Sequence, residues 1–350
     1  MDFKINNRLI GDHHPIFFIA EAGVNHNGSL ELGMKLVDIA VEAGADAVKF
    51  QTFKAENMTT PSSPKSSYHI ETTGGDNKQS WFQLLKTQEI SRKMHIDLIQ
   101  YCKNKEIIFL STPYDEESAD LLYELDVPIF KIASTDTSNT PFLSYIAKKG
   151  RPMIISTAMA TMEEVEDAVK IIKKEGLEDY AILQCTGNYP SLLSDSNLRV
   201  MQTYKNKFNC IVGYSDHTPE YINPIAATAM GAKIYEKHIT IDKNLPGPDH
   251  RMSLDPIELS KTIEMIRKTE ISLGSEEKKV LKEEEENRIK LRKSIVSNID
   301  IPKGSTLKKH MISIKRPGHG IKPSNFYDII GKKTSRNILK DSVIVKDDLI

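Results

Sequence analysis

The chain has 350 residues, and its hydrophobic fraction of 39% and charged fraction of 27% are those of a soluble globular protein. Its 47 basic and 48 acidic residues leave a net charge of −1, so we expect neither nucleic acid nor an anionic membrane as a partner. No run approaches the roughly 18 apolar residues of a membrane-spanning helix, and three cysteines, a sparse and odd number, predict reduced thiols in a cytoplasmic protein.

Eight short apolar runs recur along the first 240 residues, separated by helix-like segments. Such runs, buried on both faces, are typical of parallel strands covered by helices. The runs are PIFFIAEAG (15–23), AVKFQT (47–52), IIFLSTP (107–113), IFKIAST (129–135), MIISTA (153–158), AILQCTG (181–187), CIVGYSD (210–216) and KIYEKHIT (233–240). Eight strand–helix units in about 250 residues predict an α/β fold, a (β/α)8 TIM barrel. The alternative is a doubly wound open sheet, but no GxGxxG follows the first strand.

The segments between these runs have the periodicity of amphipathic helices. After the first run, apolar residues recur on one helical face at Leu32, Leu36, Ile39 and Ala43. Ser29 is a suitable N-cap for this helix, and Gly44 suits its C-terminal end. Residues 161–176 repeat the design, with acidic residues early and lysines late, as the helix dipole favours.

One long segment departs from this repeat. Between Phe53 and Glu89 the chain is rich in Ser, Thr, Pro and Gly, which is typical of a loop. Long loops at the mouth of a barrel are commonly lids or substrate-binding elements. We therefore expect this segment to help form a binding site, and the alternative is a floppy insertion.

The C-terminal part of the chain predicts a second domain. The segment GSEEKKVLKEEEENRIK, residues 274–290, is predicted to be a charged and largely helical linker. Beyond it, residues 291–350 have short strand-like runs separated by turn residues. We therefore expect a barrel domain over residues 1–273, then the linker, and then a small separate domain over residues 291–350.

Each predicted strand starts apolar and ends in polar residues. The C-terminal ends of barrel strands converge on one mouth, where the catalytic groups of such enzymes lie. The polar residues expected at this mouth are Glu21, Lys49, Gln51, Thr112, Lys131, Ser134, Ser156, Thr186, Ser215, His217, Glu236 and His238. Because side chains alternate along a strand, Lys131 and Ser134 both face the mouth only if Ser134 lies beyond the end of its strand.

These residue types suit a small and highly anionic substrate. Lys49 and Lys131 supply positive charges for phosphate or carboxylate, and the hydroxyl groups supply neutral donors. His217 and His238 end neighbouring strands, which lie about 5 Å apart in a sheet, so their imidazoles can share one metal ion. With no cysteine beside them and no HExxH motif, a structural zinc site is disfavoured. Two neutral histidines with oxygen ligands suit an open catalytic site for Mn²⁺ or a similar ion.

Several longer segments carry a resemblance to a known family. They are IAEAGVNHNGSLELG, GADAVKFQTFKAENM, LSTPYDEESADLL, FKIAS, GYSDHT, EKHITIDKNLPGPDHRMSLDP and KRPGHGI, and they extend over nearly the whole chain in the family's order. Together they resemble the sialic acid synthase family, which comprises N-acetylneuraminate, legionaminate and pseudaminate synthases. The resemblance implies a TIM barrel followed by a C-terminal antifreeze-like (SAF) domain, in a domain-swapped homodimer.

The resemblance also implies a reaction and a set of site residues. Phosphoenolpyruvate condenses with N-acetylmannosamine or a close relative, an N-acylated hexosamine, to give a nine-carbon 2-keto sugar acid and phosphate. Glu21 is the implied catalytic carboxylate, as a base or as an electrostatic stabiliser. His217 and His238 are the implied metal ligands, for Mn²⁺ first and otherwise for Mg²⁺ or Co²⁺. The implied phosphoenolpyruvate contacts are Lys49, Thr112, Lys131, Ser134, Ser156 and Ser215, and the implied sugar contacts are Gln51, Asp136, Tyr189, Asp249 and, from the partner chain, Arg316.

Two positions leave the acceptor sugar open. Asp136 stands where many members of the family have glutamate, and Gly187 stands where others offer a polar side chain. The first alternative is therefore an N,N'-diacetyllegionaminate synthase that uses 2,4-diacetamido-2,4,6-trideoxymannose. A Schiff-base aldolase using Lys49 or Lys131 is disfavoured by the histidine pair. A non-catalytic polysaccharide-binding protein is disfavoured because the mouth keeps usable chemistry at nearly every expected position.

Overall fold

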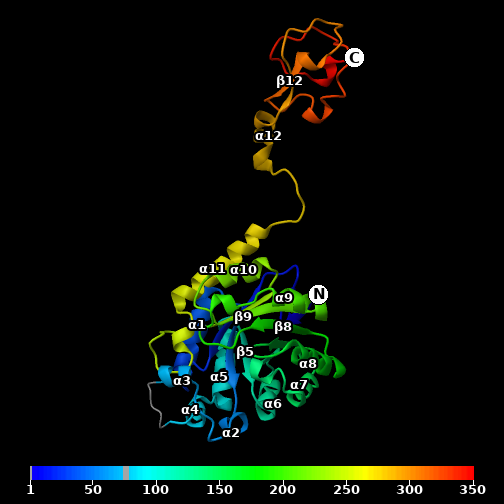
Figure 1. Ribbon diagram of the computed structural model, residues 1–350. Coiled ribbons are helices and arrows are strands. Elements are labelled where there is room, and N and C mark those ends of the chain that lie inside the picture. The colour runs from blue at the N-terminus through cyan, green and yellow to red at the C-terminus, as the bar shows by residue number, and fades with distance from the viewer. Residues whose placement is uncertain (1, 74–78) are drawn as a thin grey trace. The chain divides into compact units, whose positions relative to one another are not determined.

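The computed structural model describes residues 2–73 and 79–350. They divide into two compact units, one ending at Gly274 and the other beginning at Ser275 (Figure 1). Within the described residues, no helix is both long enough and apolar enough to cross a membrane.

The first unit is built around eight parallel strands, so the predicted (β/α)8 barrel is confirmed. The strands are β3 (Phe17–Gly23), β4 (Ala47–Thr52), β5 (Ile108–Pro113), β6 (Phe130–Ile132), β7 (Met153–Ser156), β8 (Tyr180–Cys185), β9 (Ile211–Asp216) and β10 (Ile234–His238). They pair in the order β5-β4-β3-β10-β9-β8-β7-β6. The two end strands, β5 and β6, also lie side by side, which brings the sheet close to a full ring.

Helices alternate with the strands and surround the sheet in Figure 1. They are α1 (Leu30–Ala43), α5 (Arg92–Asn104), α6 (Glu116–Glu124), α7 (Thr140–Ala147), α8 (Met162–Lys174), α9 (Val200–Phe208), α10 (Ile222–Ala229) and α11 (Pro256–Leu273). The predicted ends of α1 are confirmed, because the Ser29 side chain accepts a hydrogen bond from the backbone N–H of Leu32 and Gly44 follows the last turn with a φ of 81°. The buried face is rotated from the predicted one, since its buried residues are Gly33, Leu36, Val37 and Ala40.

The inside of the barrel changes from apolar to polar toward the C-terminal strand ends. Its apolar layer contains Ile19, Ala47, Ile154, Leu183 and Ile234. Two residues further along the same strands lie Glu21, Lys49, Ser156, Cys185 and Glu236, which line a cavity. Because strand side chains alternate with a period of two, both sets face inward. The apolar layer therefore forms a floor beneath the polar one.

An N-terminal hairpin closes the apolar end of the barrel. Strands β1 (Asp2–Ile5) and β2 (Arg8–Gly11) pair antiparallel. Phe3, Ile5 and Ile10 belong to the same buried cluster as the apolar barrel floor. The polar cavity therefore lies at the opposite end of the barrel from this hairpin.

The segment from Phe53 to Glu89 is more ordered than the sequence predicts. It contains three short helices, α2 (Ala55–Met58), α3 (Ser67–Thr72) and α4 (Trp81–Gln88), while residues 74–78 lie outside the described residues. A small apolar core joins this segment to the loop after β3, and it consists of Val24, Phe53, Ala55 and Leu85. The predicted long loop therefore contains short helices in the part of the segment that the structure describes.

The second unit is small and has its own apolar core. Strands β11 (Ser294–Ser297) and β12 (Ile312–Lys315) pair antiparallel over a cluster of Ile295, Ile301, Leu307, Ile312, Ile338 and Ile344. Before them, helical structure is limited to a 3-10 turn (Lys282–Glu284) and α12 (Glu285–Leu291). The expectation of a largely helical linker is therefore too broad, because residues 274–281 form no helix.

Candidate active site

The C-terminal strand ends enclose a cavity of about 110 Å³. Most of the residues predicted for the site line this cavity: Glu21, Lys49, Gln51, Thr112, Lys131, Ser134, Ser156, Tyr189, Ser215, His217 and His238. Glu236, which was also expected at the mouth, lines it too, and so do Tyr114 and Cys185, which were not expected there. The structure therefore brings together side chains from all eight barrel strands or the turns that follow them.

Lys49 lies at the centre of a buried network of charges. Its Nζ is 2.6 Å from Glu21 Oε2 and 3.7 Å from Glu236 Oε2. The same Nζ donates a hydrogen bond of 3.0 Å to Thr112 Oγ1. All four side chains are buried, so water screens these charges very little.

Lys131 joins the network from the other side of Glu236. Its Nζ lies 3.4 Å from Glu236 Oε1 and donates a hydrogen bond of 2.7 Å to Ser156 Oγ. The Ser215 hydroxyl donates to Glu236 Oε1 over 3.1 Å. Glu236 therefore contacts both lysines, whereas Glu21 forms an ion pair with Lys49 alone.

This asymmetry separates the two carboxylates in pKa. Burial is the largest influence on Glu21 and raises its pKa to about 7, against the opposing attraction of Lys49. Burial also acts to raise the pKa of Glu236, but Lys131 and Lys49 together hold it below its ordinary value. Glu21 can therefore exchange a proton near neutral pH while Glu236 stays ionised. Two carboxyl groups with separated pKa values are typical of acid–base chemistry.

The two predicted metal ligands lie side by side with nitrogens available. The ring centroids of His217 and His238 are 5.5 Å apart. His217 Nδ1 lies 2.7 Å from the carbonyl oxygen of Thr186. Because a carbonyl only accepts, Nδ1 carries a proton, and Nε2 is the nitrogen left to bind a ligand when the ring is neutral. His238 Nδ1 is buried without a hydrogen-bond partner among the described residues.

His238 is also held in the form that binds metal. Burial, reinforced by the positive charges of nearby lysines such as Lys49, keeps the pKa of His238 well below its ordinary value, so the ring stays neutral. Asp249 Oδ2 lies 3.9 Å from His238 Nδ1. Within the described residues, no group of three or more His, Cys, Asp or Glu side chains is arranged to hold a metal ion. The donors present therefore fit an open site that takes further ligands from water or substrate.

Glu21, Gln51 and Asp249 meet around Gly23. A Cβ atom built on Gly23 would lie 3.3 Å from Glu21 Oε1, 3.5 Å from Gln51 Nε2 and 3.6 Å from Asp249 Oδ2. Gln51 Nε2 also donates to Glu21 Oε1 over 3.3 Å. Asp249 therefore lies beside the predicted catalytic carboxylate, and burial raises the pKa of Asp249 to about 6.

The structure gives further information on three of the predicted site residues, Ser134, Asp136 and Arg316. Ser134 lies beyond the end of β6, as the alternation of side chains along the strand predicted. Its Oγ accepts a hydrogen bond from the backbone N–H of Ala158. Asp136 does not line the cavity, and its Oδ1 accepts a hydrogen bond of 3.0 Å from Asn139 Nδ2. Arg316 is an exposed residue of the second unit, and its contact with the sugar stays a prediction.

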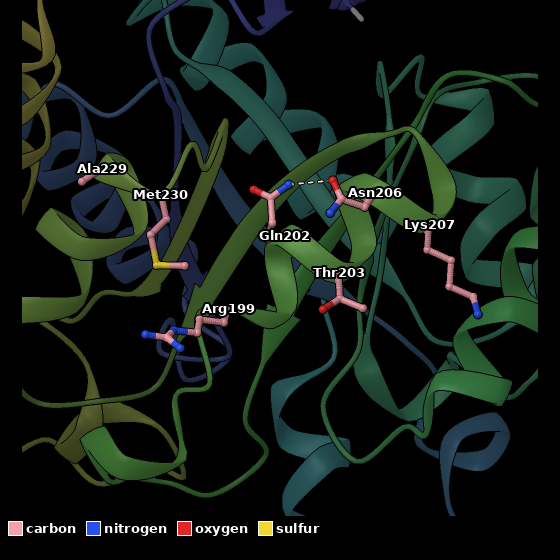
Figure 2. Close-up of a pocket in the computed structure, with 7 residues that line it drawn as sticks. All are labelled: Arg199, Gln202, Thr203, Asn206, Lys207, Ala229 and Met230. Carbon is pink, nitrogen blue, oxygen red and sulfur yellow. Dashed lines mark hydrogen bonds between the residues drawn. The ribbon is translucent and has the colours of Figure 1, made fainter.

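A broad hollow of about 810 Å³ lies outside the barrel, along α9 and the end of α10. Figure 2 shows its lining: Arg199, Gln202, Thr203, Asn206, Lys207, Ala229 and Met230. Gln202 Nε2 donates to Asn206 Oδ1 over 2.8 Å, so two of its polar groups bind each other. The described residues that line it include no carboxylate and no histidine. The chemistry is therefore concentrated in the mouth of the barrel.

The chain is similar to known proteins over nearly its whole length. A family model described as the NeuB family matches residues 36–278, and a SAF domain model matches residues 292–350. The chain is 43% identical to N,N'-diacetyllegionaminic acid synthase of Campylobacter jejuni, over 93% of this chain and 98% of that protein. It is 37% identical to human N-acetylneuraminate-9-phosphate synthase, over 97% and 94% of the two chains. The crystal structure of the spore coat polysaccharide biosynthesis protein SpsE of Bacillus subtilis matches with a TM-score of 0.67 and 38% identity, over 100% of this chain and 99% of that chain.

Proposed function

This chain belongs to the NeuB family and is a phosphoenolpyruvate-dependent nonulosonic acid synthase, and we propose that its sugar substrate is 2,4-diacetamido-2,4,6-trideoxymannose. The product is then N,N'-diacetyllegionaminate. The support is the higher identity to a legionaminate synthase, 43%, than to an N-acetylneuraminate-9-phosphate synthase, 37%. This ordering favours the alternative acceptor of the sequence analysis over N-acetylmannosamine, which becomes the second candidate.

The observation that best supports the proposed reaction is that the lysine–glutamate network and the histidine pair line the same cavity. Lys49 and Lys131 would bind the phosphate and carboxylate groups of phosphoenolpyruvate through charge-assisted hydrogen bonds. The nearby hydroxyls of Thr112, Ser156 and Ser215 would add neutral donors. Each of these groups already contacts a network partner, so their positions are fixed before the substrate binds.

A divalent ion, for which Mn²⁺ is our first candidate and Mg²⁺ or Co²⁺ the alternatives, would be held by His217 and His238 and would polarise the aldehyde oxygen of the sugar. The tautomer of His217 and the unpartnered Nδ1 of His238 support this role. Gln51, Tyr189 and Asp249 would orient the sugar beside the two histidines.

Glu21 would take the proton of the attacking water. A carbon–carbon bond forms between C3 of phosphoenolpyruvate and the aldehyde carbon, water adds to C2, and phosphate leaves with cleavage of the C2–O bond. Phosphoenolpyruvate, aldehyde and water thus become the 2-keto acid and phosphate. The pKa of about 7 suits Glu21 to accept the proton from water, since a general base works best when its pKa is near the working pH.

An acceptor screen tests this proposal. The enzyme is incubated with phosphoenolpyruvate, Mn²⁺ and each candidate sugar, and both phosphate release and product mass are measured. We expect the largest kcat/KM for 2,4-diacetamido-2,4,6-trideoxymannose. A larger kcat/KM for N-acetylmannosamine would reject this acceptor in favour of the second candidate. His238→Ala is the negative control, because it removes a proposed metal ligand from the same cavity.

We also propose a homodimer in which the second unit of one chain supplies Arg316 to the barrel of the other. The exposure of Arg316 within its own unit supports a contact made elsewhere. A guanidinium presents a fixed fork of donors, which suits the acyl oxygen and hydroxyl groups of a sugar.

A further inference from the structure

A second cavity, of about 380 Å³, adjoins the catalytic cavity at Tyr189. Tyr189 lines both, and its ring centroid lies 4.2 Å from that of His217. The ring of Tyr68, on α3, stacks near Tyr189 at a centroid distance of 6.5 Å and an interplanar angle of 30°. A ligand that reaches the histidine pair therefore has this second cavity directly beside it.

The sizes of the two cavities show why one alone does not hold both substrates. Small-molecule sites typically enclose about 300–1,000 Å³. The catalytic cavity, at about 110 Å³, is below this range, whereas the adjoining cavity, at about 380 Å³, is within it. With phosphoenolpyruvate on Lys49 and Lys131, the sugar has its aldehyde at the histidines and needs room for the rest of its carbon chain.

The lining of the second cavity suits groups that are less polar than hydroxyls. Pro219, Met252 and Leu254 contribute apolar surface beside the two tyrosine rings. Methyl groups pack favourably on such surface, because the contact removes apolar area from water. The proposed acceptor differs from N-acetylmannosamine by a methyl at C6 and an acetamido group at C4, and both of these bring a methyl group.

One edge of the cavity is charged. Arg251 Nη1 lies 3.4 Å from Glu71 Oε2, and both side chains are 67% exposed. This exposed ion pair is weak, so the guanidinium can donate to a ligand instead. An acetamido carbonyl entering the cavity would find there the fixed donors that an arginine presents.

The walls of this cavity are connected to the catalytic loop. The backbone N–H of Gly247 donates to the carbonyl oxygen of Thr72, and the Thr72 hydroxyl donates to the carbonyl oxygen of Pro248, each over 3.4 Å. Thr72 is the last residue of α3, and Asp249 follows Pro248 directly. The helix that carries Tyr68 is therefore attached to the loop that carries Asp249.

From these observations we propose that the second cavity is the subsite for the end of the acceptor sugar remote from its aldehyde, with Tyr68 and Arg251 as residues that determine specificity. Tyr68 would pack against the C6 methyl, and Arg251 would donate to the C4 acetamido oxygen. This inference rests on the proposed function, because it concerns the groups that distinguish the proposed acceptor from N-acetylmannosamine.

The test compares steady-state constants of the full-length enzyme for both sugars and for phosphoenolpyruvate. Tyr68→Ala should raise KM for 2,4-diacetamido-2,4,6-trideoxymannose by about 10-fold, the usual effect of losing one apolar contact in a substrate pocket. KM for N-acetylmannosamine and for phosphoenolpyruvate should change much less. Tyr68→Phe, which keeps the ring, should retain most of the affinity. Arg251→Met should weaken the same sugar selectively, and the matched control Arg92→Met, which breaks another exposed ion pair, should change nothing.

The outcomes separate this inference from the proposed function. If the wild-type enzyme uses the diacetamido sugar but Tyr68→Ala and Arg251→Met leave its KM unchanged, the subsite is overturned and the proposed function stands. An equal loss for both sugars and phosphoenolpyruvate would also overturn the subsite, since it would mean a general lesion. If the wild-type enzyme prefers N-acetylmannosamine, the proposed function fails first and the subsite fails with it.

Discussion

Glu21 and Glu236 lie in one cavity but differ in the number of lysines that each contacts. Lys131 and Lys49 both lie within 4 Å of Glu236, which stabilises its charge. Glu21 forms an ion pair with Lys49 only, and burial dominates its pKa. The same residue type therefore has two tasks: Glu236 balances the lysines, and Glu21 is available for proton transfer.

The variant Glu21→Gln tests this division of tasks. The amide keeps the shape and the neighbour Gln51 but cannot take a proton from water. We expect kcat to fall by about 100-fold or more, the usual contribution of a general base, with a smaller change in KM for phosphoenolpyruvate. Steady-state phosphate release measures both constants. The exposed Glu31→Gln is a matched control, and a Glu21→Gln enzyme with wild-type kcat would rule out the proton-transfer role.

Removal of the metal gives a second test at this scale. A chelator should abolish phosphate release, and Mn²⁺ should restore it. His238→Ala should weaken Mn²⁺ binding by more than about 10-fold, because even loss of a group that only supports a ligand costs that much. Calorimetric titration with Mn²⁺ measures the affinity, and circular dichroism checks the fold. The exposed His310→Ala is the control, and full turnover by chelated enzyme would exclude the metal role.

The alternation of side chains along strands predicts most residues of the cavity. Two polar residues two positions apart at the end of a strand, such as Glu236 and His238, lie on the same face and can be recognised in the sequence. Ser134 was placed correctly by the same rule, since it had to follow the strand end. The sequence placed Glu236 at the mouth but did not predict its ion pairs with Lys49 and Lys131, because these depend on distances between side chains of different strands. Asp136 does not line this cavity, because the 3-10 turn after β6 directs its carboxylate to Asn139, and its contact with the sugar stays a prediction.

At the scale of single elements, one buried histidine attaches α5 to the barrel and another stabilises the loop after β3 from within. His95, on α5, contacts Thr52 Oγ1 through Nε2 at 2.8 Å and the Ser91 carbonyl through Nδ1 at 2.9 Å. His26 Nδ1 accepts from the backbone N–H of Gly28. Burial lowers the pKa of each histidine to about 4, so both stay neutral in the folded protein.

These histidines predict a loss of stability in mild acid. In the unfolded chain each titrates near pH 6.5, so below that pH the unfolded state binds protons that the folded state does not. The contribution of these two histidines to the free energy of unfolding of the barrel should therefore fall between pH 6.5 and about 4, by about 2 kcal/mol for each histidine at pH 5. Glu21 and Asp249, whose pKa values are raised, contribute in the opposite direction. Urea unfolding at pH 7 and pH 5 measures this change.

His95→Gln isolates one of the two contributions. The variant is expected to be less stable at pH 7, but its loss of stability between pH 7 and pH 5 should be smaller than that of the wild type by about 2 kcal/mol. The exposed His13→Gln should leave the wild-type pH dependence in place. An unchanged pH dependence in His95→Gln would mean that His95 is not held neutral by the fold.

The prediction of helices and strands succeeds where an apolar pattern persists over many residues and fails where the element is short. The caps of α1 and the eight barrel strands follow from capping residues and sustained apolar runs. The β1–β2 hairpin has strands of only four residues, too short for alternation to identify them. Helices α3 and α4 of the 53–89 segment begin after serine N-caps at Ser66 and Ser80, but a composition rich in loop residues conceals them.

At the scale of the whole molecule, the barrel has one closed end and one reactive end. The hairpin residues Phe3, Ile5 and Ile10 join the apolar floor, so the interior is inaccessible from that side. Substrates therefore enter where the strands end in polar residues, and the aromatic group of Tyr68 and Tyr189 lies beside that entrance. The fold thus restricts the chemistry to one end of the sheet, as in other TIM-barrel enzymes.

The proposed dimer predicts that two inactive chains can complement each other. One chain carries His238→Ala, which damages its own barrel but leaves Arg316 intact. The other carries Arg316→Ala, which leaves its barrel intact. If Arg316 acts on the barrel of the partner chain, the intact barrel of the second chain receives the intact arginine of the first, and one site in each mixed dimer works.

The measurement uses two different tags, so that only mixed dimers are purified and assayed for phosphate release. The reference is a mixed dimer of wild type and His238→Ala, which also has one intact barrel, and we expect the two mixed dimers to have similar activity. If Arg316 instead serves its own barrel, every site in the complementation dimer has one lesion, and its activity should be no higher than that of either homodimer. A mixed dimer that is folded, binds one equivalent of Mn²⁺ and yet remains inactive would therefore exclude an arginine shared between chains.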